Sequence, residues 1–132
     1  METKMSLKTE GLRHVALSVR HLEDSVKFYT NILNMEIEWQ PDADNYYLTS
    51  GNDNLALHRT DETFSEFKQQ HLDHIGFILK TMDDVDAWYA RMLEHDVKIL
   101  KEIKTHRDGA RSFYCADPDG NVVQMIYHPP IS

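Results

Sequence analysis

The sequence has a single cysteine, Cys115, among its 132 residues. One cysteine cannot form a disulfide within the chain, so the sequence is not that of a small disulfide-stabilised secreted domain. No apolar run approaches the roughly 20 residues of a membrane-spanning helix. The first residues also lack the basic and then apolar pattern of a signal peptide. These absences lead us to expect a soluble, cytoplasmic protein that does not bind membranes.

Positive charge is also scarce, with 14 Lys and Arg against 22 Asp and Glu, a formal net charge of −8. Such a balance argues against a basic surface for nucleic acid or anionic lipid. The expected partner is a small molecule or another protein chain. A chain of 132 residues is within the usual size of one domain.

What the sequence does contain is an internal repeat. Residues 12–37, LRHVALSVRHLEDSVKFYTNILNMEI, align without a gap with residues 72–97, LDHIGFILKTMDDVDAWYARMLEHDV, at an offset of 60 positions. His14 falls on His74, and Tyr29 falls on Tyr89. Self-similarity over a unit of this size indicates duplicated supersecondary structure.

Each unit starts with the alternating pattern of a strand and continues with the spacing of an amphipathic helix. The helix must pack on the strand face that carries Val15 and Leu17, so His14 and His74 are expected on the opposite faces of their strands. Tight turns are predicted at 50–54 and 117–121, where Asp, Gly and Asn gather. Further strands are predicted at 35–39, 46–49, 55–59, 97–103, 112–115 and 122–127.

Both units therefore predict strand, helix, strand, strand, strand, which makes the chain an α+β protein of two βαβββ modules. We expect an N-terminal tail at 1–11 and one domain at 12–130. Within that domain the expected parts are a first module at about 12–60, a linker at 61–71 and a second module at about 72–130.

These two repeats, followed by FYCADPDGNVVQMIYHP near the end of the chain, resemble the vicinal oxygen chelate superfamily. This superfamily includes glyoxalase I, bleomycin and fosfomycin resistance proteins, and extradiol dioxygenases. The resemblance implies that curved sheets of the two modules form a cleft-shaped mixed sheet, and that the protein is a homodimer. It also implies a divalent metal, held by a residue from the first strand of each module and a carboxylate from the last strand of the second.

Carried over residue by residue, the resemblance implies that His14 and His74 are metal ligands and that Gln124 stands where a glutamate is usual. In the glyoxalase branch a fourth ligand comes from the fourth strand, and His58 is the candidate there. Imidazole suits Zn, Ni, Mn or Fe. The alternative for the histidine pair is two strand residues hydrogen-bonded in a polar cleft, and for His58 an exposed histidine at a strand end.

Gln124 weakens the expected site, because its amide offers a dipole where a carboxylate would offer a full charge. An amide also cannot accept a proton from substrate at neutral pH. Tyr114 and Arg111 are candidate substrate contacts, the arginine as a basic loop residue for an anionic group. Their alternatives are an aromatic packed in the core and a solvated loop cation.

Two functions stay open at this point. The first is a metal-dependent enzyme of lyase, isomerase, dioxygenase or thiol-transfer type that acts on a small oxygenated substrate. The second is a metal-free protein that binds or sequesters a small molecule, as bleomycin resistance proteins do. Gln124 favours the second function, and the pair of histidines favours the first.

Overall fold

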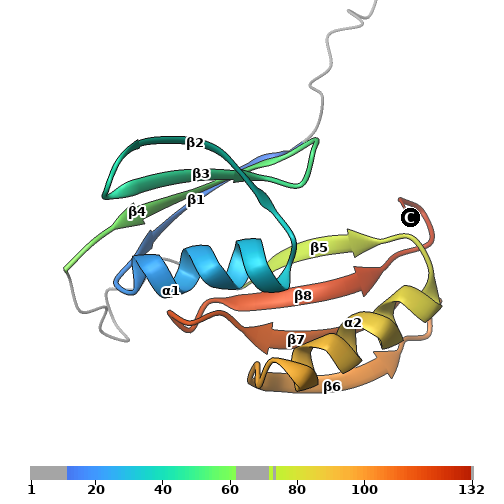
Figure 1. Cartoon of the computed structure of the whole chain (residues 1–132). Coiled ribbons are helices and arrows are strands. Elements are labelled where there is room, and N and C mark those ends of the chain that lie inside the picture. The colour runs from blue at the N-terminus through green and yellow to red at the C-terminus, as the bar shows by residue number, and fades with distance from the viewer. Residues whose placement is uncertain (1–11, 62–71, 73, 132) are drawn as a thin grey trace, which may run out of the picture.

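The computed structural model describes residues 12–61, 72 and 74–131 (Figure 1). The predicted tail at 1–11 and all of the predicted linker beyond Asp61 lie outside these residues. The first module consists of β1 (His14–Val19), α1 (Leu22–Lys27), the π-helix η1 (Phe28–Ile32), β2 (Glu36–Asp42), β3 (Asn45–Thr49) and β4 (Asn54–Arg59). The second consists of β5 (Ile75–Leu79), α2 (Met82–Glu94), β6 (Ile99–Thr105), β7 (Arg111–Ala116) and β8 (Val122–Tyr127).

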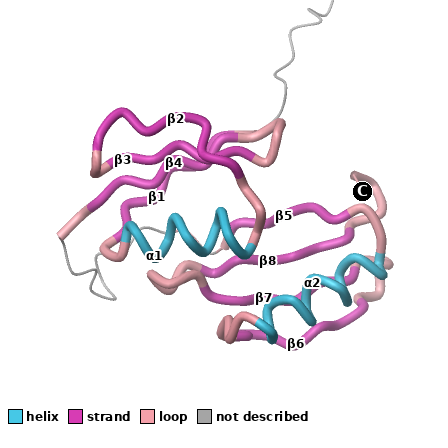
Figure 2. Tube along the Cα trace, in the orientation of Figure 1, coloured by secondary structure: helices cyan, strands magenta, loops and turns pink. Residues whose placement is uncertain are grey.

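The order of elements confirms the prediction of two βαβββ modules (Figure 2). The strands form two four-stranded sheets, ordered β1-β4-β3-β2 and β5-β8-β7-β6. In each sheet the first and last strands of the module are parallel neighbours, and the other pairs are antiparallel. Within the described residues, β1 and β5 each have one hydrogen-bonded neighbour, so each has an unpaired edge.

The helix of the first module buries the side chains that its sequence spacing predicts. Leu22, Val26, Tyr29 and Leu33 are all buried, although the second half of the helix is wound as a π-helix. The sequence spacing from Leu22 to Leu33 does not mark this winding, which adds one residue to a turn of the helix.

The two helices start in different ways. Helix α2 has a capping box, in which Thr81 accepts from the backbone N–H of Asp84 and the Asp84 side chain accepts from the backbone of Thr81. Helix α1 has no side-chain cap of its own. The backbone just before α1 is held instead by Asp119 of the second module, whose carboxylate accepts from the N–H groups of Arg20 and His21 at 2.8–3.0 Å.

The helix-bearing faces of both sheets contribute to one hydrophobic core. Helix α1 and η1 lie between the two sheets (Figure 1), and the Tyr29 ring lies 6.4 Å from the Phe77 ring of β5. The Tyr29 hydroxyl donates to Asp117, and Arg91 of α2 donates to the carbonyl of Ile32. Because the helix-bearing faces turn toward this shared core, the opposite faces of the two sheets turn away from it.

No helix in the described part of the chain is long and apolar enough to span a membrane.

Candidate functional site

The candidate site residues lie on the sheet faces that no helix covers, which we call the first and second helix-free faces. Strand alternation and register define both sets. The first face carries His14, Ala16, Ser18, Asn45, Tyr47, Thr49, Asn54, Ala56 and His58. The second carries His74, Gly76, Ile78, Ser112, Tyr114, Ala116, Val122, Gln124 and Ile126. Both histidines of the predicted pair therefore lie opposite the helices, as the alternation predicted.

His14 is held by a chain of hydrogen bonds on the first face. Its Nδ1 lies 2.8 Å from Oδ1 of Asn54, the residue directly opposite on β4. The Nδ2 of Asn54 donates to a carboxylate oxygen of Glu38 at 3.0 Å. An ionised carboxylate can only accept, so the amide must direct its nitrogen to Glu38 and its oxygen to His14. Nδ1 of His14 therefore donates to Asn54, and in the neutral ring the lone pair is on Nε2.

His58 is held by a second chain of the same kind. Its Nδ1 lies 2.6 Å from Oδ1 of Asn45, and Nδ2 of Asn45 donates to Asp42 at 2.8 Å. The same reasoning assigns the proton to Nδ1 of His58 and the lone pair to Nε2. Within the described residues Nε2 of neither histidine makes a hydrogen bond.

Aromatic rings extend from His58 across the first sheet. The Tyr47 ring meets the His58 ring edge-on at 5.9 Å between centroids, and the Trp39 ring of β2 stacks on Tyr47 at 5.0 Å. Trp39 is 58% exposed. Ala16 of β1 pairs with Ala56 of β4, and this pair lies midway along the strands between His14 and His58.

The second helix-free face places His74 beside Tyr114, with ring centroids 5.3 Å apart in an edge-on arrangement. Tyr114 pairs across the strands with Gln124, which pairs in turn with Gly76. The Gln124 Oε1 lies over Gly76, 3.7 Å from where a Cβ would stand, and so points toward the strand that follows His74. The ammonium group of Lys101 lies 5.3 Å from the centre of the Tyr114 ring.

The internal repeat shows which first-face residue corresponds to Gln124. Gln124 is opposite the residue two positions after His74, and Ala56 is opposite the residue two positions after His14. Ala56 offers no ligand atom. His58 lies two residues after Ala56 and opposite Ser18, which is four residues after His14 on β1. At the usual rise of a strand, this offset separates the levels of His14 and His58 by about 13 Å. This register argues against His58 as a ligand to the same metal ion as His14.

Within one chain, His14 and His74 do not lie on the same sheet face. Among residues 12–61, 72 and 74–131, no group of three or more His, Cys, Asp or Glu side chains is arranged to hold a metal ion. His14 and His74 belong to different sheets whose helix-free faces turn away from the common core.

The two predicted substrate contacts differ in their surroundings. Tyr114 lies on the second helix-free face next to His74. Arg111 lies on the helix side of β7, where its guanidinium donates to Asp86 of α2 at 2.7 Å and to the hydroxyl of Thr105 at 2.6 Å. Arg111 is therefore already paired with a carboxylate on the face opposite His74.

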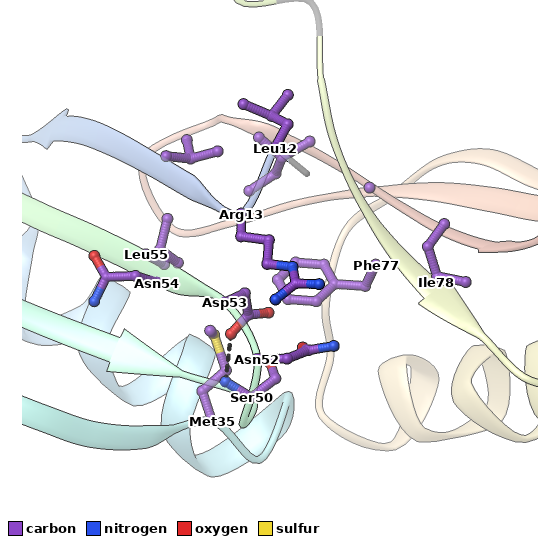
Figure 3. A pocket seen from close by; sticks show the side chains of 13 residues that line it. Leu12, Arg13, Met35, Ser50, Asn52, Asp53, Asn54, Leu55, Phe77 and Ile78 are labelled. Carbon is purple, nitrogen blue, oxygen red and sulfur yellow. Dashed lines mark hydrogen bonds between the residues drawn. The ribbon is translucent and has the colours of Figure 1, made fainter. Parts of the chain in front are cut away.

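A cavity of about 480 Å³ lies between the unpaired edges of β1 and β5. Figure 3 shows Arg13, at the start of β1, and Asp53, in the turn before β4, on one side and Phe77 of β5 on the other. None of the predicted ligands lines this cavity. The cavity thus lies between residues of β1, which starts at His14, and residues of β5, which starts just after His74.

Buried titratable groups surround Asp117 in the shared core. Burial, reinforced by the Asp117 charge, raises the pKa of Tyr29 well above its usual value. Burial likewise raises the pKa of the Cys115 thiol to about 12, with a smaller contribution from Asp117. Asp117 is satisfied by the Tyr29 hydroxyl, by the side-chain amide of Asn121 and by two backbone N–H groups. These groups connect the modules and lie away from the helix-free faces.

Sequence reasoning missed Asn54 and Asn45, because both were read as polar residues in or next to turns. It also missed Lys101, which was taken only as part of a strand. Nothing local marks the asparagines as histidine partners. Asn54 meets His14 only because β1 and β4 pair in parallel, 40 residues apart.

Residues 11–125 match the model of the Glyoxalase/Bleomycin resistance protein/Dioxygenase superfamily. The chain is 28% identical over 121 residues to the "Metallothiol transferase FosB" of Staphylococcus epidermidis, covering 88% of this chain and 82% of that protein. It is 29% identical over 131 residues to the "Trivalent organoarsenical cleaving enzyme" of Bacillus sp. (strain MD1), covering 89% and 79%.

Among solved structures, lactoylglutathione lyase from Agrobacterium tumefaciens has the same fold, with a TM-score of 0.77 at 17% identity over 94% of this chain and 98% of that one. The family match spans both modules and both helix-free faces. The chain therefore belongs to the Glyoxalase/Bleomycin resistance protein/Dioxygenase superfamily.

Proposed function

We propose that this protein is a divalent-metal-dependent enzyme acting on a small oxygenated substrate. In this proposal each metal site is made by two chains, with His14 from one and His74 and Gln124 from the other. The observation that carries it is the pair of histidines at equivalent positions of the two helix-free faces, one of them fixed with a free ring nitrogen.

The donor atoms fit a divalent ion of the imidazole-binding type. His14 presents an unprotonated Nε2, which is the form of histidine that binds metal. On the second face, His74 and the amide oxygen of Gln124 lie two residues apart in register. A ligand set of two ring nitrogens and one amide oxygen carries no negative charge, whereas a set with a carboxylate does. Weak metal binding is therefore expected.

The packing of the chain supports a site shared between two copies. The shared core keeps the helix-free faces of one chain directed away from each other. The unpaired edges of β1 and β5 are free to meet the edges of a second copy, and proteins commonly cover such edges. A second copy packed on these edges would bring a first face and a second face together.

A divalent ion at this position would polarise vicinal oxygens of the substrate. Side chains of the protein would bind and orient the parts of the substrate that do not coordinate the ion. The Tyr114 ring lies beside the His74 ring and Lys101 lies over the Tyr114 ring, so the ammonium group and the phenol could donate hydrogen bonds to substrate oxygens. Gln124 cannot take a proton, so a proton-transfer step would need a group other than the usual glutamate. The names of the transferase and of the organoarsenical cleaving relative also favour an enzyme.

The test is metal binding by mixed dimers. Chains with His14→Ala and chains with His74→Ala are co-expressed with two different tags that contain no histidine, and the mixed dimer is isolated with both tags. If each site uses His14 of one chain and His74 of the other, the mixed dimer has one intact site. We expect it to bind one Zn²⁺, Ni²⁺ or Mn²⁺ per dimer, while each parent variant binds at least tenfold more weakly.

Sites built within single chains would leave every site of the mixed dimer with one defect. Loss of binding in the mixed dimer would therefore reject the two-chain arrangement. If both parent variants bind metal like the unmodified protein, the metal site is not at these histidines. A metal-free binding protein would then be the better interpretation, and the neutral Gln124 is the observation that favours it.

A further inference from the structure

The hydrogen bonds that link Asp42, Asn45 and His58 repeat the arrangement that links Glu38, Asn54 and His14. They occur at a position where the proposed metal site uses no ligand. The register separates the two histidines by four residues along neighbouring strands. In its neutral form His58 therefore presents the lone pair of Nε2, which the proposed metal site does not use. A histidine held in this form accepts a hydrogen bond and cannot donate one from that nitrogen.

The surroundings of His58 suit a flat ring. Tyr47 stands edge-on to the His58 ring, and Trp39 stacks on Tyr47. Ala16, between the two histidines, is small and exposed, so it leaves room above the sheet. Aromatic side chains attract other flat rings through stacked and edge-on contacts.

The first helix-free face also has the wrong chemistry for an anion or for a typical protein interface. Its nine positions on β1, β3 and β4 include no Lys or Arg, whereas carboxylates of Glu38 and Asp42 support its asparagines. The same nine positions include no Leu, Ile, Val or Met, the residues that an aliphatic protein contact would use. The lone pair of His58 Nε2 favours a neutral ligand that donates a hydrogen bond.

We propose that His58, oriented by Asn45 beside the Trp39–Tyr47 stack, is a recognition site for a flat ring that carries a hydroxyl or N–H group. This inference rests on the proposed function for its place beside the metal, but ring binding itself requires no metal. It gives the substrate class as a small aromatic or conjugated ring compound with a hydrogen-bond donor. Asn45 is a positioning residue, since it acts through His58.

The experiment uses the full chain without metal and two probes, 2-naphthol and 2-methoxynaphthalene. Both rings are flat, but only the first can donate a hydrogen bond. Binding is followed by NMR at the indole N–H of Trp39, which a Trp88→Phe background leaves as the only tryptophan signal. We expect 2-naphthol to bind more tightly than 2-methoxynaphthalene by about threefold to tenfold, the value of one hydrogen bond.

The two chains of hydrogen bonds serve as controls for each other. Asn45→Ala is expected to weaken 2-naphthol binding by about threefold to tenfold and to leave 2-methoxynaphthalene unchanged. In ¹⁵N spectra, the same variant should allow His58 to populate the tautomer protonated at Nε2. Asn54→Ala is expected to release the tautomer of His14 instead, to weaken metal binding, and to leave 2-naphthol affinity unchanged.

The proposal is overturned if the two probes bind equally, if neither perturbs the Trp39 signal, or if Asn45→Ala leaves 2-naphthol affinity unchanged. His58→Phe gives a second check, because it keeps an aromatic ring and removes the acceptor. If Trp39→Leu changes the mass measured by light scattering but not ring binding, the face is a contact between chains and the proposal is wrong. Failure of the metal experiment alone would leave these ring-binding results intact.

Discussion

The two helix-free faces share one backbone plan and differ in chemistry at nearly every equivalent position. Tyr47 and Tyr114 occupy matching places, but Trp39 stacks on the first tyrosine and Lys101 stands over the second. Where the first face has Ala56, the second has Gln124.

The difference shows which parts of a repeated module are constrained by the core and which are not. Backbone pairing and the buried side of each sheet are constrained by the core, so they are kept in both modules. The helix-free side is not needed for the core, and its residues are free to differ. In this chain one face carries aromatic rings and fixed acceptors, and the other carries an amide, a phenol and an ammonium group.

The largest expected effect concerns the core that joins the modules. The pKa values of Tyr29 and Cys115 are raised in the folded protein. The unfolded chain therefore loses these protons first, so this contribution to stability is complete below about pH 8, under the usual pKa of a thiol, and is lost as pH rises toward 12. We expect the free energy of unfolding to fall by roughly 4 kcal/mol between pH 9 and 11, at up to about 1.4 kcal/mol per pH unit for each group.

Urea denaturation at several pH values measures this effect. Cys115→Ala should make the alkaline slope shallower, whatever constant destabilisation it adds. An unchanged slope in that variant would mean that the thiol does not titrate differently in the folded and unfolded states.

The next effect compares the equivalent tyrosines of the two modules. Tyr29 donates to the buried carboxylate of Asp117, whereas the Tyr89 hydroxyl makes no hydrogen bond within the described residues. Tyr29→Phe should therefore lower the free energy of unfolding by about 2 kcal/mol, the usual value for a hydrogen bond to a charged group. Tyr89→Phe is the matched control, and chemical denaturation should detect a change of less than about 0.5 kcal/mol. Equal losses of stability in the Tyr29→Phe and Tyr89→Phe variants would contradict the expected difference between the two tyrosines.

Charge at the equivalent positions of the faces gives the third prediction. Gln124→Glu adds a carboxylate beside His74 and should tighten divalent metal binding by about 1 kcal/mol or more, at least about fivefold in the dissociation constant. Ala56→Glu adds the same group to the first face, where it should give no such gain. Calorimetric titration with Zn²⁺, Ni²⁺ or Mn²⁺ compares them. A gain from both substitutions, or from neither, would contradict the proposed role of Gln124.

The smallest effect tests how each helix begins. Thr81→Ala removes the capping box of α2 and should cost about 1 kcal/mol of stability. Asp119→Ala removes the hydrogen bonds that the second module makes to the backbone just before α1, and a similar loss of about 1 kcal/mol is expected because the carboxylate binds two backbone N–H groups. Asp119→Asn should recover part of it. Thermal denaturation of the three variants would refute this intermodule contact if Asp119→Ala were neutral.

Most of the fold could be predicted from the sequence, because its signals are local and occur twice. The alternation around His14 and His74, the helical spacing from Leu22 to Leu33, and the turn residues at 50–54 and 117–121 each report on a few neighbouring positions. The strand at Val122–Tyr127 has the predicted bounds. Arg111 shows the limit of such reasoning, since a residue expected in a loop lies in β7 and donates to Asp86 of α2.

The candidate site depended on contacts that local patterns do not encode. Parallel pairing of β1 with β4 brought Asn54 to His14 and placed His58 four residues away from it, while the shared core turned the two histidines in different directions. The sequence by itself determined the two modules and the face of each strand that carries a histidine, because periodicity follows from the backbone. Only the tertiary structure decided which histidines have neighbours that fix their protons, because hydrogen-bond partners come from strands that are distant in the chain.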